Sequence, residues 1–313
     1  MHGSNRIGRL LTAAGIAVSL AGTTLALAAP AQAAAAPTRT SAVPTRVRHA
    51  TTTSPTISAL YAEIEDAANG SVVWGKSQNT EVPMGSITKV MTALVVIETA
   101  GTSGLTHLDT VPQGITAYDE DYGASTAGLV PGEQLTTLQL LYALLVPSGC
   151  DAAYTLAQAY GPGLSAFIAE MNTKAAALGL KHTHFTDFSG LPDPTETSTY
   201  STASDLITLG RDAMQLPLFA TIVKTSSYQV PAVTGNHPAF TWNSTNPILG
   251  VYPGAIGLKT GSTNGAGYCL LFEAVKNDES VIGVVLDDPT GFSVVAADAT
   301  TLLNYGFAHF PAS

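Results

Sequence analysis

Hydrophobic side chains repeat along this chain with two different periods, which predict strands near its two ends and helices in its middle. Two apolar runs, at 57–65 and 70–75, flank Asn69-Gly70. Because Asn-Gly adopts the tight turns that join antiparallel strands, these runs predict a β-hairpin. The stretch after Lys89 is apolar on nearly every side until Gly101, a pattern typical of a helix buried in a core.

The remainder of the chain divides into helical spacing followed by strand-like alternation. Residues 102–133 are rich in Gly and Pro and are predicted to be mainly loops. Four further helices are predicted, at 136–145, at 151–160, at 164–178 and after the capping-box sequence Thr202-Ala-Ser-Asp205. Three strands are predicted at 255–259, 268–275 and 281–286, before a closing helix at 291–306.

This order of elements predicts an α+β fold. A hairpin, a helical middle, three strands and a last helix fit one mostly antiparallel sheet flanked by helices, with a helical subdomain inserted roughly over residues 102–215. The region 57–313 is long enough for one large core together with such a subdomain. We find no internal repeat at any period.

The first 33 residues have the layout of a secretory signal peptide. Arg6 and Arg9 precede a long apolar run, and Ala31-Gln32-Ala33 offers a small-residue cleavage site. A retained membrane anchor is the alternative, because the apolar run is long enough to span a bilayer if it is not cleaved. Residues 34–56, rich in Ala, Thr, Pro and Arg, are predicted to be a flexible tail. The mature protein is therefore expected to be secreted, outside the cytoplasm.

Charge changes sign at the same boundary. Residues 1–56 contain five arginines and no acidic residue, so the remainder carries eight Lys and Arg against all 23 acids, a formal charge of −15. A surface this acidic is not expected to bind nucleic acid. Lys89 and Lys259 are two of the eight cations in this region, which makes them candidates for roles other than solubility.

Ser86-Ile-Thr-Lys89 is the only Ser-x-x-Lys in the chain, and it begins the predicted buried helix. Positions three apart share a helix face, so Lys89 can reach the Ser86 hydroxyl and act as its base. Pro83 and Gly85 place the serine at the helix start, where free backbone N–H groups favour developing negative charge. These features make Ser86 the candidate nucleophile.

Ser148-Gly149-Cys150 lies in a break between two predicted helices. Such a break leaves the Ser148 hydroxyl free to face a cleft, where it could relay a proton to a leaving amine. The alternative is a plain helix N-cap ahead of Asp151.

Lys259-Thr260-Gly261-Ser262 ends a predicted strand. The lysine can attract a substrate carboxylate, Thr260 and Ser262 can hydrogen-bond it, and Gly261 lets the backbone come close. The alternative is a strand end with an ordinary turn.

In this order, Ser-x-x-Lys, Ser-Gly-x and Lys-Thr-Gly resemble the signature of penicillin-binding proteins and serine β-lactamases. Longer matching stretches at 144–154, 200–206 and 252–270 narrow the resemblance to the low-molecular-mass D-alanyl-D-alanine carboxypeptidases. With its Ser-Gly-Cys, the chain looks most like the short actinomycete DD-transpeptidases. The resemblance covers essentially 57–313 and implies the fold of penicillin-binding proteins and serine β-lactamases.

The resemblance implies a serine DD-peptidase that acts on the D-Ala-D-Ala ends of peptidoglycan stem peptides, as a carboxypeptidase, a transpeptidase or both. Ser86 would form an acyl-enzyme, Lys89 would take its proton, and Ser148 would help to protonate the leaving nitrogen. β-Lactams should acylate Ser86 as well, and no metal or cofactor is implied. The backbone N–H groups of Ser86 and Ser262 would form an oxyanion hole. The residues expected to hold the substrate are Lys259, Thr260, Gly261, Ser262 and Cys150.

The chain departs from the wider family at two places. Cys150 stands where the family usually has an Asn that bonds both the substrate amide and the active-site lysine. A thiol is a weaker donor and acceptor than an amide, so this position bears on the strength of carboxypeptidase action. The chain also stops at Ser313, just after its last predicted helix, so a C-terminal membrane anchor is not expected. The expected location is the cell envelope.

Two other functions stay open at this point. A serine β-lactamase shares the three motifs but needs a deacylating base, for which Glu196 is the nearest candidate. A non-catalytic protein on a penicillin-binding fold is suggested only by Cys150. His182 and His184 have no further ligand at metal spacing, so no metal site is expected. Cys150 and Cys269 can pair in an exported protein, but a bridge would block the expected cleft.

Overall fold

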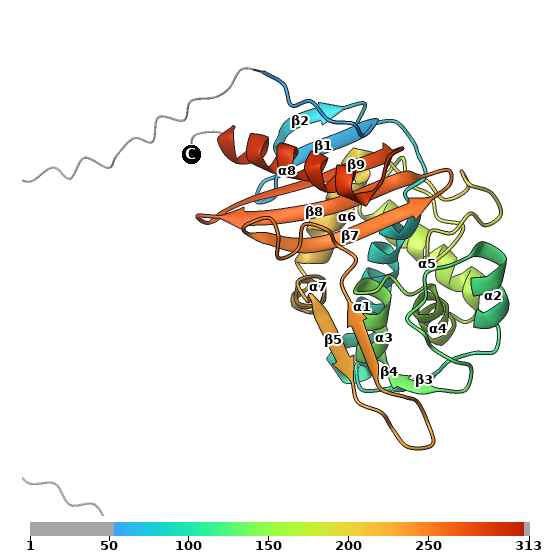
Figure 1. The fold of residues 1–313 in the computed structure, drawn as a ribbon. Coiled ribbons are helices and arrows are strands. Elements are labelled where there is room, and N and C mark those ends of the chain that lie inside the picture. Colours follow the sequence, from blue (N-terminus) through green and yellow to red (C-terminus); the bar gives the residue numbers. More distant parts are fainter. Residues whose placement is uncertain (1–52, 310–313) are drawn as a thin grey trace, which may run out of the picture. The chain divides into compact units, whose positions relative to one another are not determined.

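The computed structural model describes residues 53–309 (Figure 1). The signal peptide expected over 1–33 and residues 34–52 of the expected tail lie outside the described residues, as do residues 310–313. The domain boundaries expected from the sequence therefore stay a prediction.

A five-stranded antiparallel sheet is the framework of the described part, with the strand order β2-β1-β9-β8-β7 (Figure 1). Its strands are β1 (Tyr61–Asp66), β2 (Val72–Lys76), β7 (Ala255–Thr263), β8 (Gly267–Lys276) and β9 (Glu279–Asp288). The predicted hairpin around Asn69-Gly70 is confirmed as β1–β2, and the three predicted C-terminal strands are confirmed as β7 to β9. Pairing of β1 with β9 joins these two distant parts of the chain into one sheet.

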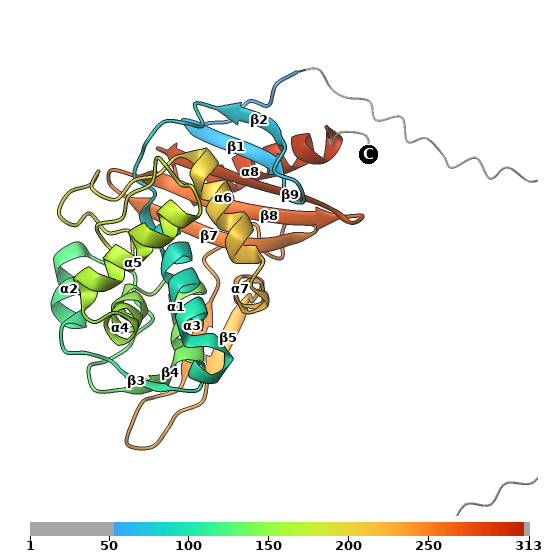
Figure 2. The same cartoon turned by 180° about the vertical axis from the view of Figure 1, so that it is seen from behind.

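Helices cover both faces of this sheet (Figures 1 and 2). The closing helix α8 (Phe292–Ala308) packs on one face, where Leu270 and Phe272 of β8 contribute to its core. Helix α6 (Ala203–Met214) packs on the opposite face, where its Gly210 lies against Leu271 and Ile282. Successive side chains of a strand point to opposite faces, so β8 contributes to both cores.

The buried helix that begins near Ser86 consists of the short 3₁₀ turn η1 (Gly85–Thr88) and α1 (Lys89–Gly104). The other helices are α2 (Ile115–Tyr122), α3 (Thr137–Leu145), α4 (Cys150–Tyr160), α5 (Leu164–Ala177) and α7 (Pro217–Val223). Residues 89–96 of α1 are all buried, and α1 packs against α3, α4, α5 and α6. Its backbone leaves helical geometry at Gly101, where the sequence predicts the helix to end. Within residues 53–309, no single helix is long and apolar enough to cross a membrane.

The capping sequences behave differently at two of these helices. Thr136 forms a complete capping box with Gln139 at the start of α3. At α6, Thr202 accepts the predicted bond from the Asp205 N–H, but the Asp205 carboxylate accepts from His182 N and Thr183 Oγ1. The second capping box is thus half formed, because a neighbouring segment supplies better donors to its acid.

Several short elements were not predicted from the sequence. Helix α2 lies inside the stretch 102–133 that was predicted to be mainly loops, and Ile115 is its only buried residue. The other unpredicted elements are α7 and the strands β3 (Leu108–Thr110), β4 (Gln134–Thr136), β5 (Ser227–Val230) and β6 (Phe240–Asn243). Elements this short or this polar carry too few periodic positions for a sequence pattern to indicate them.

Candidate active site

Ser86 and Lys89 meet at the start of the buried helix. Ser86 lies in η1, Lys89 is the first residue of α1, and the Lys89 Nζ donates a hydrogen bond of 2.7 Å to the Ser86 Oγ. The Lys89 side chain is fully buried, with 0% exposure, whereas Ser86 lines an open cleft. A neutral Lys89 at this distance can take the hydroxyl proton directly.

The turn that carries Ser86 presses against the end of strand β7. A Cβ added to Gly85, whose φ is +54°, would lie 2.6 Å from the backbone nitrogen of Ser262. A Cβ on Gly261 would meet the Met84 carbonyl oxygen and lie 3.1 Å from the Ser86 nitrogen. Only glycines allow this approach, which brings the backbone of Ser86 beside that of Ser262. The approach suits a pair of N–H donors for one oxyanion.

Lys89 has two contacts besides Ser86. Its Nζ lies 3.2 Å from the Cys150 Sγ and donates a 3.1 Å bond to the Ser189 carbonyl oxygen. Cys150 begins α4 and is buried, and both Cys150 and Cys269 are free thiols, so the bridge that the sequence left open is not formed. The Lys89 Nζ therefore has one weak partner, the sulfur, and two oxygen partners.

Ser148 sits between α3 and α4 in a left-handed conformation, with φ of +68°. It accepts a 2.8 Å bond from the Lys259 Nζ, and its carbonyl accepts a 2.7 Å bond from the Ser125 hydroxyl. The N-cap of α4 is Gly149, without a side-chain cap, so the N-cap alternative for Ser148 is wrong. The Ser148 side chain belongs instead to the cleft, next to the predicted carboxylate-binding lysine.

Lys259 is almost completely buried, with 1% exposure. Burial, and then the nearby charge of Lys89, lowers the pKa of Lys259 well below its usual range. Its Nζ also donates a 3.0 Å bond to the Thr260 carbonyl, while the Thr260 hydroxyl is bonded to that of Thr245 at 2.8 Å. A substrate carboxylate bound beside Lys259 would raise its pKa again, because a nearby negative charge favours the protonated amine.

One cleft of about 690 Å³ collects the predicted residues. Ser86, Ser148, Cys150, Thr260, Gly261 and Ser262 line it, and the two lysines lie buried behind its wall. The other walls are formed by the end of α2 with residues 122–125, by the segment 191–196 and by the turn between β7 and β8. All three sequence motifs therefore reach one cavity.

Comparison with known proteins shows which family this chain belongs to. The family model described as D-alanyl-D-alanine carboxypeptidase matches residues 48–290. The chain belongs to the D-alanyl-D-alanine carboxypeptidase family. The resemblance inferred from the three motifs is confirmed.

Individual relatives of this carboxypeptidase family agree in sequence and fold. The D-alanyl-D-alanine carboxypeptidase of Streptomyces sp. strain K15 is 40% identical over 265 residues, which are 82% of this chain and 89% of that protein. The crystal structure of the Streptomyces K15 DD-transpeptidase matches with a TM-score of 0.77 and 41% identity, over 82% of this chain and 99% of that one. The D-alanyl-D-alanine carboxypeptidase of Mycobacterium tuberculosis matches with a TM-score of 0.74 and 33% identity, over 82% and 94%. The expected fold class is confirmed.

Glu196, the candidate base of the β-lactamase alternative, lines the same cleft, next to the turn between β7 and β8. Its Oε2 accepts a 2.9 Å bond from the Thr263 hydroxyl and a 3.0 Å bond from the Gly265 N–H. Glu196 therefore fastens its own segment to the turn after β7. An oxygen that is engaged in this way is poorly prepared to activate a water.

Some residues around the cleft lie outside the three motifs and were not predicted from the sequence. Ser125 and Thr245 contact Ser148 and Thr260, and both come from connecting segments with no recognised pattern. The Ser189 carbonyl reaches Lys89 from a segment that starts at Asp187. Asp-x-Ser-Gly is a turn signal that indicates local structure but not what the turn contacts. Within residues 53–309, no group of three or more His, Cys, Asp and Glu side chains could hold a metal ion.

Proposed function

We propose that this protein is a serine DD-peptidase that cleaves the D-Ala-D-Ala ends of peptidoglycan stem peptides through an acyl-enzyme on Ser86. The bond of 2.7 Å between Lys89 and Ser86, at the wall of the shared cleft, carries the proposal. The family match supports it, and so do the names of the three relatives above, which are D-alanyl-D-alanine carboxypeptidases and a DD-transpeptidase.

Acylation begins when the Ser86 Oγ attacks the carbonyl carbon of the penultimate D-Ala. The hydroxyl proton passes to Lys89, which lies within direct hydrogen-bonding reach. The oxygen of the tetrahedral intermediate is stabilised by the backbone N–H groups of Ser86 and Ser262. When the C–N bond breaks, the leaving nitrogen receives a proton delivered through Ser148, and the last D-Ala departs.

Binding of the terminal carboxylate is the proposed role of Lys259, Thr260 and Ser262. The Lys259 Nζ holds the Ser148 hydroxyl at 2.8 Å, so the group that protonates the leaving nitrogen is fixed beside the group that holds the leaving residue. Gly261 permits close approach of strand β7 to the Ser86 turn. Cys150 faces both the cleft and Lys89, where a thiol replaces the usual amide.

Deacylation completes the cycle. Water or an acceptor amine attacks the ester carbonyl, gives its proton to Lys89, and the Ser86 Oγ recovers a proton as the ester bond breaks. β-Lactams carry an amide that Ser86 can open in the same way. Since the family acts on peptidoglycan, the protein works outside the cytoplasm, and we propose export by a signal peptide over residues 1–33.

Product analysis tests the proposal. A peptide ending in Lys-D-Ala-D-Ala should lose one D-Ala, and an added acceptor amine should divert part of the product into a new amide. The same peptide with an L-Ala terminus serves as the control and should not react. Absence of D-Ala release, with and without the acceptor, would contradict the proposed activity.

A further inference from the structure

Lys89 is held by a segment of the chain that lies 100 residues away in the sequence. Its Nζ donates to the Ser189 carbonyl at 3.1 Å, and the neighbouring Phe188 carbonyl accepts a bond from Thr92. A Cβ on Gly190 would collide with the carbonyl of Gly85, directly before the candidate nucleophile. Three consecutive residues of this segment, 188–190, therefore lie against η1 and the first turn of α1.

The carboxylate of Asp187 gives the segment its shape. This side chain is buried, and its Oδ1 accepts bonds from the backbone nitrogens of Ser189 at 2.7 Å and of Leu191 at 3.0 Å. The Gly190 nitrogen and the Ser189 hydroxyl donate to the same oxygen. One buried carboxylate that accepts several backbone N–H bonds fixes the peptide planes around it. It thereby sets the direction of the Ser189 carbonyl.

Tyr118 of helix α2 also binds Asp187 and Ser189 through its hydroxyl. Its hydroxyl donates to the Asp187 Oδ2 at 2.5 Å and lies 2.7 Å from the Ser189 Oγ. Burial, and then the charge of Asp187, raises the pKa of Tyr118 well above its usual range, so the hydroxyl stays a donor. Its ring stacks on Phe188 at 5.2 Å and meets Tyr154 edge-on at 5.4 Å.

The direction of the Lys89 lone pair depends on these contacts. A neutral amine has two N–H donors and one lone pair. If the donors point to the Ser189 carbonyl and the Cys150 sulfur, the lone pair points to the Ser86 hydroxyl. Because the sulfur is a weak acceptor, the carbonyl is the stronger of the two anchors.

We propose that Tyr118, Asp187 and Ser189 form a positioning unit that keeps the Ser189 carbonyl against Lys89 and so aims the amine at Ser86. None of the three lines the cleft, so they act through Lys89 and not on the substrate. The inference rests on the proposed function of Lys89 as the base. It adds a role for residues outside the three sequence motifs.

Tyr118→Phe tests the unit, because it removes the hydroxyl and keeps the ring that stacks on Phe188. Tyr154→Phe is the matched control, since it removes a hydroxyl from the same aromatic cluster without touching Asp187 or Ser189. The acylation rate constant and the dissociation constant of the first, non-covalent penicillin complex are measured separately. We expect Tyr118→Phe to acylate about tenfold more slowly with an unchanged dissociation constant, because only the orientation of the base is lost. Tyr154→Phe should match the parent protein.

Equal acylation rates for Tyr118→Phe and Tyr154→Phe would overturn the inference, and so would a loss that appears only in the dissociation constant. If Tyr118→Phe does not fold, Ser189→Ala decides. It removes the hydroxyl that bridges Tyr118 and Asp187 but keeps the carbonyl, and it must also slow acylation selectively. Parent protein that is not acylated at all would contradict the proposed function instead, so the two failures are distinguishable.

Discussion

Lys259 is proposed to bind the substrate carboxylate through its positive charge, but it is buried, and burial disfavours that charge. Burial, and then the electrostatic effect of the nearby Lys89, lowers the pKa of Lys259 well below its usual range. A lysine whose pKa is lowered loses its proton at a lower pH than a free lysine. The charge that would hold a substrate carboxylate is therefore lost as pH rises through the lowered pKa.

We predict that peptides with a free C-terminal carboxylate lose affinity as pH rises through this lowered pKa, whereas amidated peptides do not. Lys259→Arg should remove most of this pH dependence, because a guanidinium stays protonated. The measurement is the apparent KM for matched acid and amide peptides as a function of pH. Parallel profiles for the two peptides would mean that Lys259 does not bind the carboxylate.

Among the elements, the contact between η1 and β7 is the one on which the oxyanion site depends. Gly85→Ala would place a methyl group 2.6 Å from the Ser262 nitrogen, so the turn and the strand must separate. Gly101 of α1 has nearly the same φ, +55° against +54°, with nothing near its missing side chain. Substitution of Gly101 therefore tests backbone strain alone, whereas substitution of Gly85 adds a collision with strand β7.

We predict that Gly101→Ala loses about 1–3 kcal/mol of unfolding free energy, the usual cost of a strained φ, and that Gly85→Ala loses more because the collision is added to the strain. Only Gly85→Ala should also lose acylation, because it displaces the two N–H groups that would bind the oxyanion. Chemical denaturation and penicillin acylation rates measure the two effects. Full acylation of Gly85→Ala would contradict the proposed oxyanion site.

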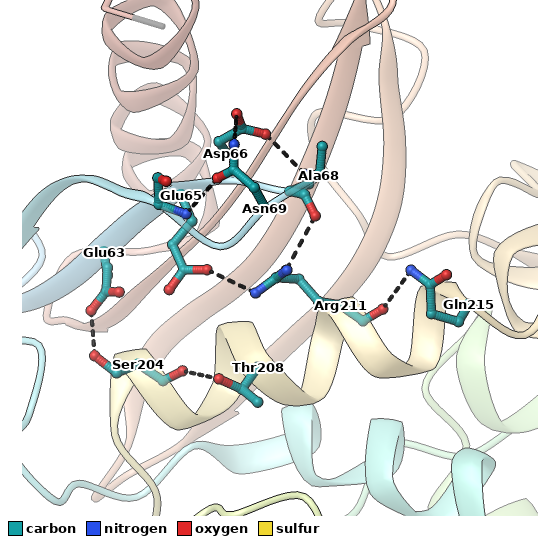
Figure 3. A network of polar contacts seen from close by, with 11 residues as sticks. Glu63, Glu65, Asp66, Ala68, Asn69, Ser204, Thr208, Arg211 and Gln215 are labelled. Carbon is teal, nitrogen blue, oxygen red and sulfur yellow. Dashed lines mark hydrogen bonds and ion pairs between the residues drawn. The ribbon is translucent and has the colours of Figure 1, made fainter. Parts of the chain in front are cut away.

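The interface between β1 and α6 contains a buried pair of acids (Figure 3). Glu63 bonds the Ser204 hydroxyl, and the Glu65 Oε2 lies 3.6 Å from a guanidinium nitrogen of Arg211. Burial, and then Glu63, raises the pKa of Glu65 to about 8, which Arg211 only partly opposes. The folded protein thus keeps a proton on this carboxyl at neutral pH, whereas an unfolded chain releases it near pH 4.5, the usual value.

The sign of the resulting pH dependence follows from this difference. A raised acid pKa gives stability that is complete below about pH 4.5 and is lost as pH rises through about 8. We predict that Glu65→Gln flattens the fall in Tm across this window and is relatively more stable than the parent protein at alkaline pH. Glu170→Gln, an exposed glutamate of α5, is the control and should follow the parent curve. Identical slopes for all three proteins would show that Glu65 is ionised in the folded state.

At the scale of the whole molecule, local patterns predicted most of the fold and contacts across the chain escaped prediction. The hairpin at Asn69-Gly70 and the start of helix α3 near Thr136 depend on neighbours within a few residues, so their signals are complete in the sequence. The three motifs likewise carry fixed residue types at fixed spacing. The contact between Lys89 and the Ser189 carbonyl has no such signal, because a backbone oxygen is present in every residue. Which backbone oxygen lies next to Lys89 can be seen only in the folded structure.

The most direct test of the account is the intact mass of the protein after incubation with a labelled penicillin. We predict a long-lived increase of one drug mass, located on the peptide that contains Ser86, and no increase in Ser86→Ala. Rapid turnover of the drug would favour a β-lactamase, and no adduct on the parent protein would favour a non-catalytic protein. An adduct that persists at full level in Ser86→Ala would contradict the central claim that Ser86 is the nucleophile.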